Sequence, residues 1–522
     1  MIQIVDTTLR DGSQTEGISF SVDDKIQIVH QLDDLGIKWI EAGSPAANPS
    51  DNVFFKTIDP ASLKNASLVA FGPTCKPGIA PEDDTALRIL SDCSAEIKTI
   101  FGKSSLFHVT NVLHCSEKEN LRMIRDSIHW LVENGNTVWF DAEHFFDGYA
   151  ENPAYALETV STAMEAGASC IVLCDTNGGS FPEQISSAVT AVKKTCSILL
   201  GFHGHNDIGL AVANTLAALE AGCSLLQGTI GGIGERCGNT DLCTLIPLLS
   251  LKKHIRCIQS ESLSNLTHIS RVISEIMNVV PNSNAPFVGH SAFAHKAGIH
   301  IDAIIKDPSA YESVNPESVG NQRRFLLSNQ SGRTGIYARL NKLLPDLDRN
   351  SPEIETIMNR LKEKESRGYT YENADGSFDL LALDTIGRRP HYFEVVDYHV
   401  LSSRNISTSD KSSLSAQAYL KIRVDGKEGI NAAEGNGPVN ALDVALKKTL
   451  SLFYPCISRV TLRDFKVRVL NSAGTASKVR VSIESTDGVH IWNTVGVSED
   501  IIQACLKALT DSVDYMLTKY AD

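Results

Sequence analysis

The chain has 522 residues, of which 42% are hydrophobic and 21% are charged, and its formal net charge is −14. This length exceeds one ordinary core, so we expect a water-soluble protein of two or three domains. The acidic balance and the lack of a basic run argue against nucleic-acid binding, and no apolar stretch approaches the length of a membrane span.

The first 270 residues alternate helix-like segments with short apolar runs. Four runs follow a helical segment that ends in glycine, the residue that best accepts the left-handed conformation just past a helix end; these glycines are Gly36, Gly135, Gly167 and Gly222. The other four runs are IQIVD (2–6), SLVAFG (67–72), SLFHVT (105–110) and LLGFHG (199–204). Eight strands that alternate with helices over about 250 residues predict an α/β fold with a closed (β/α)8 TIM barrel. A doubly wound open sheet is the alternative, but no GxGxxG turn follows the first strand.

Two further regions follow the predicted barrel domain, which we place at residues 1–270. Residues 271–388 look like a helical linker with small subdomains, and they include the segment IETIMNRLKEKESR (354–367). Residues 389–522 contain three strand-like segments and a helix-like segment, and then the same series again. This order predicts an α+β module of two βββα units, with Ser498 and Asp500 at the start of the last helix as N-cap and acidic first turn. The module has no evident catalytic cluster, so regulation or dimerisation is its expected role.

Polar side chains follow most of the predicted strands, at the ends where the functional residues of such a barrel gather. In HGHND, His203 and His205 are two residues apart, so along a strand they point to the same side. One carboxylate, two imidazoles and one amide oxygen at this face would suit a divalent cation with open positions for substrate. A polar loop is the alternative for any one residue, because polar residues at strand ends are common. The candidates are Arg10, Asp11, Glu41, His108, Glu143, Thr176, His203, His205 and Asn239.

Three segments give a specific resemblance. DTTLRDGSQ (6–14), HGHND (203–207) and GGIGERCGN (231–239) are similar to the signatures of the DRE-TIM metallolyase superfamily. A barrel, then a linker with HKAGIHIDAI and YESVNPESVG, then a duplicated module resembles the 2-isopropylmalate, homocitrate and citramalate synthases over nearly the whole chain. Ser13 in SQTEG, and the segment FDAEHFFDGY around Glu143, are most similar to the longer class of (R)-citramalate synthases.

This resemblance implies an acyltransferase that condenses acetyl-CoA with pyruvate and hydrolyses the thioester, giving (R)-citramalate and CoA for isoleucine biosynthesis. It also implies a divalent metal cofactor (Mn, Mg, Zn or Co) that the 2-oxo acid chelates and that polarises the ketone. The ligands implied by the resemblance are Asp11, His203, His205 and Asn239.

The roles of the other candidates at the strand ends are implied in the same way. Arg10 would stabilise the alkoxide that forms on the ketone oxygen. Thr176 and His108 would bind the carboxylate of the substrate.

The base that the resemblance implies is His300, in GIHID, with Glu143 and Tyr311 assisting. A histidine that titrates near neutrality suits removal of a proton from the acetyl methyl group. Judged from the residues alone, His300 could instead be a loop histidine with a structural hydrogen bond, and His290 and His295 lie close to it in the sequence.

Other interpretations remain open from the sequence. The same barrel could serve a 2-isopropylmalate or homocitrate synthase with another 2-oxo acid, a retro-aldol acyl-CoA lyase, or a non-catalytic amino-acid sensor. We expect a homodimer whose C-terminal module binds an effector such as isoleucine, with no nucleic-acid or membrane partner. Twelve scattered cysteines without a CxxC pair, and a charged N-terminus unlike a signal peptide, indicate a reduced, cytoplasmic protein. Cys237, inside GERCGN, is interpreted as a packing residue.

Overall fold

The structure is a computed structural model that describes residues 2–326, 332–348, 350–404, 414–470 and 477–520. It divides into two compact units, each of which is described by itself. The first consists of Met1–Phe293 and Ser313–Arg323, and the second of Ala294–Glu312 and Arg324–Asp522. No helix within the described ranges has both the length and the apolar character needed to cross a membrane.

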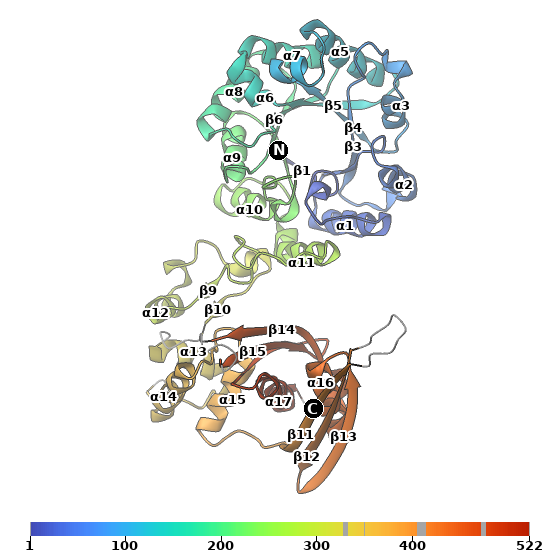
Figure 1. Ribbon diagram of the computed structural model, residues 1–522. Coiled ribbons are helices and arrows are strands. Elements are labelled where there is room, and N and C mark those ends of the chain that lie inside the picture. Colours follow the sequence, from blue (N-terminus) through green and yellow to red (C-terminus); the bar gives the residue numbers. More distant parts are fainter. Residues whose placement is uncertain (1, 327–331, 349, 405–413, 471–476, 521–522) are drawn as a thin grey trace. The chain divides into compact units, whose positions relative to one another are not determined.

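The first unit contains a closed ring of eight parallel strands, and helices cover its outside (Figure 1). The first strand pairs with both the second and the eighth, which closes the ring. The predicted (β/α)8 barrel is therefore confirmed. Its strands are β1 (Gln3–Asp6), β2 (Trp39–Gly43), β3 (Ser67–Pro73), β4 (Ile97–Lys103), β5 (Thr137–Glu143), β6 (Cys170–Asp175), β7 (Leu199–Gly204) and β8 (Leu225–Gly228).

Helices connect each strand to the next and bury one apolar face against the ring. The first begins with a capping box between Ser21 and Asp24, and it ends at Gly36, whose φ of 85° is left-handed as predicted. The helices of this unit are α1 (Val22–Leu35), α2 (Pro49–Thr57), α3 (Thr85–Ser91), α4 (Leu106–Asn111), α5 (Glu117–Glu133), α6 (Phe145–Glu151), α7 (Pro153–Glu165), α8 (Pro182–Thr195), α9 (Ala211–Ala221), α10 (Leu242–Pro247) and α11 (Leu266–Ile276).

The interior of the ring has an apolar layer and a polar layer. Side chains alternate between the two faces of a strand, so the residue two positions after an inward-facing residue also points inward. The apolar layer is a buried cluster that includes Val5, Val69, Trp139, Val172 and Leu225. Two residues beyond Trp139 and Leu225, toward the carboxyl ends, the strands place the buried Asp141 and Gln227. The interior of the barrel is therefore apolar toward the amino ends of the strands and carries polar side chains toward their carboxyl ends.

One of the eight predicted strands was wrong. The segment SLFHVT (105–110) lies mainly in helix α4, and the fourth strand is the preceding Ile97–Lys103. That strand carries Lys98, which is buried because its ammonium donates hydrogen bonds to the carbonyl oxygens of Cys93 and Ala95. A lysine inside a buried strand hides the apolar pattern that marked the other strands.

The second unit contains helices that form a small apolar cluster around Leu340, Ile357 and Phe378, and Val495 from a later strand also belongs to this cluster. Helix α14 confirms the helical segment predicted from 354 to 367. The helices are α12 (Gly298–Lys306), α13 (Gly332–Leu343), α14 (Pro352–Ser366) and α15 (Asp375–Thr385), and the short strands β9 (Ala294–His295) and β10 (Arg324–Phe325) pair beside them.

The rest of the second unit is the predicted pair of βββα units. Each sheet is antiparallel with its middle strand second in sequence, and each is covered by its own helix (Figure 1). The two helices contact each other in one buried core that contains Trp492, Leu446 and Met516. The elements are β11 (Glu394–Arg404), β12 (Leu414–Val424), β13 (Lys427–Gly435) and α16 (Pro438–Leu450), then β14 (Thr461–Val469), β15 (Val479–Thr486), β16 (Ile491–Ser498) and α17 (Ile501–Tyr520).

The start of α17 differs from the sequence-based prediction in one respect. The Asp500 carboxylate accepts hydrogen bonds from the backbone N–H groups of Ile502 and Gln503, so Asp500 is the capping residue. The Ser498 hydroxyl instead accepts from the backbone N–H of Asp500. The prediction had assigned the cap to Ser498.

Candidate functional site

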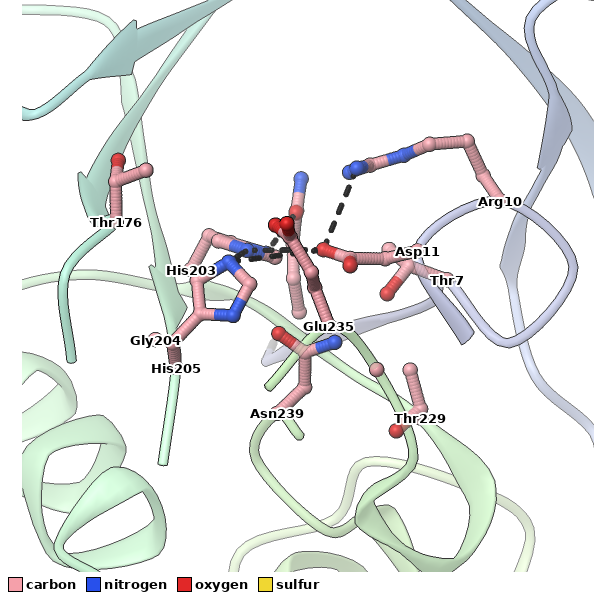
Figure 2. Close-up of polar contacts among 12 residues, drawn as sticks. Thr7, Arg10, Asp11, Thr176, His203, Gly204, His205, Thr229, Glu235 and Asn239 are labelled. Atoms are coloured by element: carbon pink, nitrogen blue, oxygen red, sulfur yellow. Dashed lines mark hydrogen bonds and ion pairs between the residues drawn. The ribbon is translucent and has the colours of Figure 1, made fainter. Parts of the chain in front are cut away.

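Three side chains predicted as metal ligands converge at the carboxyl ends of the strands. Asp11 follows β1, His203 lies in β7, and His205 comes just after β7. The Nε2 atoms of the two histidines are 3.2 Å apart, and the Asp11 Oδ2 atom lies 3.3 Å from Nε2 of His203 and 3.9 Å from Nε2 of His205. Figure 2 shows all three side chains directed at one point. One ligand atom from each residue lies within 4.8 Å of the others, so together they could hold one metal ion.

The electrostatics of this group keep the carboxylate charged. Burial would raise the pKa of Asp11, but the Arg10 guanidinium and His203 outweigh it and hold the pKa well below its usual range. Burial and the neighbouring His203 lower the pKa of His205 to about 3, so His205 is neutral at pH 7 and its nitrogen lone pair is available. Burial would lower the pKa of His203 too, but its hydrogen bond with Asp11 raises it.

Asn239 completes the predicted ligand set. An isolated backbone bridge pairs it with His205, and its side-chain N–H donates to the carbonyl oxygen of Ile233 at 3.2 Å. The loop that carries it depends on Gly238, whose φ is 88° and where a Cβ atom would lie 2.0 Å from the carbonyl oxygen of Gly232. Figure 2 shows Asn239 beside the histidines. Asn239 thus adds a second oxygen, beside the carboxylate of Asp11 and the two imidazole nitrogens, to the same face.

The unpaired polar atoms of this group fit a cation. Oδ1 of Asp11 and Oδ1 of Asn239 are buried and have no hydrogen-bond partner among the described residues. Unsatisfied buried oxygens are costly, and a divalent ion is a partner that would satisfy both. Carboxylate, amide and imidazole donors are also the mixture that divalent metals accept. The residues present therefore fit a divalent cation.

Arg10 is held by contacts on several sides. Its Nε atom donates to Oε1 of Glu41 at 2.5 Å, and its Nη1 atom lies 3.3 Å from Oδ2 of Asp11. The guanidinium carbon lies 4.0 Å from the centroid of the Phe71 ring. Its positive charge is thus fixed beside the carboxylate that the cation would share. Glu41 was a candidate without a role, and the structure indicates that it orients Arg10.

Asp141 is a second buried carboxyl group in the polar layer. It lies within electrostatic range of Glu41, Arg10 and His203, and burial raises its pKa to about 7. Asp141 was not among the residues predicted for the site. A carboxyl group inside the strand FDAE, two residues before Glu143, was the only signal that could have found it.

The remaining barrel candidates gather at the ends of β4, β5 and β6. Glu143 forms an ion pair with Lys103 at the end of β4. The Thr176 hydroxyl accepts a hydrogen bond from the backbone N–H of His144 at 2.8 Å, and the ring of His144 stacks on His108 with centroids 3.6 Å apart. His108 was expected at the end of strand 4 but lies on α4. Sequence reasoning missed Lys103 and His144, because only the fold places them next to the candidates.

Arg236, in the GERCGN loop, ties three loops at the carboxyl face together. Its guanidinium donates to both carboxylate oxygens of Asp207, at 2.8 and 3.0 Å, and to the backbone carbonyl oxygen of Thr176 at 2.7 Å. These contacts join the loops after β6, β7 and β8. The loop after β8 also carries Asn239, so Arg236 should hold this predicted ligand in place.

We therefore expect Arg236→Gln to lower divalent-metal affinity by about tenfold. The unfolding free energy should change by less than about 1 kcal/mol, because exposed ion pairs contribute little to stability. Metal titration and thermal unfolding of the purified protein measure the two effects. Arg122→Gln is a matched control, because Arg122 forms a similar surface network with Glu119 and Asp126 on α5. Wild-type metal affinity in Arg236→Gln would rule out this bracing role.

His300 and Tyr311 belong to the second unit. Their rings stack with centroids 4.2 Å apart, and both side chains are exposed. The structure thus brings the two predicted catalytic partners together as a pair on that unit. His295, which the sequence left as a rival, instead lies 3.1 Å from a carboxylate oxygen of Glu312 and is half-buried.

The prediction for Cys237 was wrong. Its side chain is exposed, because Glu235, Arg236 and Cys237 form the exposed part of the GERCGN loop, whereas Gly238 and Asn239 are buried. All twelve cysteines are free thiols, as predicted.

Three family models match successive parts of the chain. Residues 1–273 match the HMGL-like family, residues 287–368 match the homocitrate synthase post-HMGL domain-like family, and residues 372–517 match the LeuA allosteric (dimerisation) domain. An (R)-citramalate synthase from Geobacter sulfurreducens is 46% identical over 520 residues, covering 99% of this chain and 98% of that protein. An (R)-citramalate synthase from Synechocystis sp. is also 46% identical, covering 98% and 96%. A probable 2-isopropylmalate synthase from Methanopyrus kandleri is 30% identical, covering 100% and 99%.

Proposed function

We propose, because the chain belongs to the family of (R)-citramalate synthases, that it condenses acetyl-CoA with pyruvate and hydrolyses the thioester to release (R)-citramalate and CoA. The observation that carries this proposal is the buried group of Asp11, His203 and His205 beside the Arg10 guanidinium. Such a group offers what an aldol-type condensation on a 2-oxo acid requires, a place for a Lewis acid and a fixed cation. Supply of citramalate to isoleucine biosynthesis is part of the same proposal.

In this proposal a divalent cation (Mn, Mg, Zn or Co) is held by Asp11, His203, His205 and Asn239. When bound, it supplies a Lewis acid for the ketone of the 2-oxo acid. Arg10 stabilises the negative charge that develops on the ketone oxygen as the carbon–carbon bond forms. The hydrogen bond from Arg10 to Glu41 supports this role, because a guanidinium that is already oriented need not reorganise when the negative charge develops on the ketone oxygen.

The carboxylate of pyruvate is bound by the Thr176 hydroxyl, with His108 as a further contact. The hydroxyl of Thr176 already accepts one hydrogen bond from the backbone, which leaves its own O–H free to donate to an anion. The role of His108 is supported by its position, since its ring lies against His144 near the same strand end.

His300 is the base in this proposal, with Tyr311 and Glu143 assisting. His300 takes a proton from the acetyl methyl group, and the carbanion attacks the ketone carbon of pyruvate. The alkoxide then takes up a proton, and water cleaves the thioester so that CoA leaves with the sulfur. The stacked His300–Tyr311 pair supports this assignment because it keeps the imidazole beside a second proton-carrying group.

The test of the function is release of CoA from acetyl-CoA with pyruvate, 2-oxoisovalerate and 2-oxoglutarate in parallel. We expect kcat/KM to favour pyruvate by at least about tenfold, the scale on which a pocket separates aliphatic groups of different size. Faster reaction with 2-oxoisovalerate or 2-oxoglutarate would reassign the protein to the isopropylmalate or homocitrate synthases. Absence of CoA release with all three, in metal-loaded protein, would favour a sensor.

The assembly is proposed to be a homodimer in which the linker region, residues 271–388, serves the partner's barrel. We expect that mixing His300→Ala chains with Asp11→Ala chains restores activity, because one of the two shared sites in each heterodimer then carries neither change. Recovery is measured as CoA release by heterodimers that have been purified with two different affinity tags. Each variant mixed with itself is the control. Verified heterodimers without activity would indicate that His300 serves its own chain.

The C-terminal module, residues 389–522, is proposed to bind isoleucine and inhibit the barrel. The glycine-containing turns GNGPVN (435–440) and GVSED (496–500) precede the two helices, and helix N-termini with free N–H groups suit the carboxylate of an amino acid. At α17 the first N–H groups are already capped by Asp500. At α16 the capping position is Gly437, which has no side-chain cap. The first βββα unit is therefore the better candidate.

We expect isoleucine to bind the intact protein and to inhibit it, with a coupling free energy of about 1–3 kcal/mol. Isothermal titration with isoleucine, leucine and valine, with activity measured in parallel, tests this. If none of the three binds or inhibits at millimolar concentration, the module is a dimerisation unit only.

A further inference from the structure

We propose that Gln227 is a positioning residue that fixes His203 as the tautomer whose Nε2 lone pair faces the metal site. This inference rests on the proposed metal site and deepens it. It concerns a residue of β8 that is neither a ligand nor a contact of the substrate, and that acts through His203.

Strand pairing places Gln227 beside His203. Strands β7 and β8 pair at Gly201 with Leu225 and at Phe202 with Leu226, so the next residues along the two strands are His203 and Gln227. The Oε1 atom of Gln227 lies 2.9 Å from Nδ1 of His203. The Gln227 side chain is 0% exposed and His203 is 5% exposed, so water does not compete for this contact.

The barrel has no packing reason for an amide at this position. Gln227 lies in the run LLQG, and the residue two positions earlier on the same face, Leu225, belongs to the apolar layer. A buried amide costs free energy unless its hydrogen-bonding groups are satisfied. Among the described residues the Gln227 carbonyl meets His203, while its Nε2 atom has no partner. The hydrogen bond with His203 is thus the interaction that offsets part of the free-energy cost of burying this amide.

The chemistry of the pair sets the tautomer. A carbonyl oxygen can only accept a hydrogen bond, so Nδ1 of His203 must carry the hydrogen. When a cation takes the place of the proton between Nε2 and Asp11, Nε2 of the neutral ring is therefore the lone-pair nitrogen; it lies 3.2 Å from Nε2 of His205 and 3.3 Å from Oδ2 of Asp11. An imidazole that donates its second N–H in this way is a better-oriented and more basic metal ligand.

His205 provides a contrast within the same site. Its Nδ1 atom is buried and has no hydrogen-bond partner in the described part of the chain. The fold therefore presets one of the two imidazoles and leaves the other to be ordered by the metal. Loss of the Gln227 oxygen should then weaken binding at the one histidine that is prepared in advance.

The experiment compares Mn²⁺ binding by the full-length wild-type protein with that of Gln227→Met and Gln227→Glu, measured by isothermal titration. Methionine keeps the length of the side chain but offers no carbonyl oxygen, whereas glutamate restores an oxygen acceptor. We expect Gln227→Met to bind Mn²⁺ about 10–100-fold more weakly and Gln227→Glu to stay within about threefold of wild type. The visible absorption of Co²⁺-loaded protein should change in the methionine variant and return toward wild type in the glutamate variant.

Gln3→Met is the matched control, because the Oε1 atom of Gln3 also accepts a ring N–H, from Trp39, at the opposite end of β1. It should bind Mn²⁺ as wild type does. Unchanged affinity in Gln227→Met would overturn the inference, and so would equal losses in the methionine and glutamate variants, which would indicate a packing role. If Gln227→Met does not fold, a tenfold loss of Mn²⁺ affinity in Gln227→Glu alone would also overturn the inference. Failure of the wild-type protein to bind Mn²⁺ would instead overturn the proposed metal site.

Discussion

Replacing Asp11 or His203 by alanine should abolish turnover, with a loss of about three orders of magnitude or more. A metal Lewis acid supplies several kcal/mol of transition-state stabilisation, and each 1.4 kcal/mol corresponds to a factor of ten in rate. Oδ2 of Asp11 lies 3.3 Å from Nε2 of His203 and 3.9 Å from Nε2 of His205. Asp11 is also the one negatively charged residue among the four proposed ligands, so its removal takes away the charge that attracts the cation. Divalent-metal binding should weaken in parallel.

This prediction is checked by metal titration, CoA release and thermal unfolding of the same preparations. The barrel should stay folded, because its apolar layer and helix contacts lie apart from the ligands. His129→Ala, a change at an exposed histidine on α5, is the control and should behave as wild type. A variant that has lost metal yet turns over normally in the presence of chelator would contradict the role of the site.

Arg10→Lys should lower kcat by about 10²–10³, the scale for loss of one preorganised donor to a developing oxyanion, and should raise KM for the oxo acid far less. The structure gives the reason. Arg10 uses Nε for Glu41 and Nη1 for Asp11, and its flat guanidinium lies over Phe71. A lysine ammonium has one nitrogen and no plane, so it cannot make these contacts and still address the ketone oxygen.

Steady-state kinetics with pyruvate as the varied substrate separate the two parameters for Arg10→Lys. Arg122→Lys serves as the control, since Arg122 makes comparable ion pairs on α5. An effect confined to KM would assign Arg10 to ground-state binding only.

The grouping of an aspartate with two histidines could be predicted from the sequence, because strand periodicity and barrel topology together specify which strand-end side chains face one another. An HxH pair at one strand end and an aspartate after another must face the same side of a closed parallel barrel, so Asp11, His203 and His205 could be expected to meet. Glu41 was visible as a strand-end residue, but its contact with Arg10 depends on how two neighbouring strands are aligned. A single sequence does not specify that alignment.

The errors have physical causes of the same kind. The fourth strand was misplaced because Lys98 interrupts its apolar pattern, and the lysine is tolerated only through carbonyl partners that tertiary structure supplies. Cys237 was expected to pack, but its side chain is exposed although the neighbouring Gly238 and Asn239 are buried, and a single sequence does not specify which residues of a loop face the solvent. Gln227 escaped notice because one amide in a short buried strand acquires a meaning only when its partner, His203, is known.

If this metal site is the centre of a condensation between acetyl-CoA and pyruvate, both acetyl carbons must end up in the product. The most direct measurement uses acetyl-CoA labelled with ¹³C in both acetyl carbons, unlabelled pyruvate, and mass spectrometry of the products from metal-free and metal-loaded protein. We expect citramalate that carries both labelled carbons, formed in step with free CoA, from the metal-loaded protein alone. Free CoA without labelled citramalate, or equal product from the metal-free protein, would contradict it.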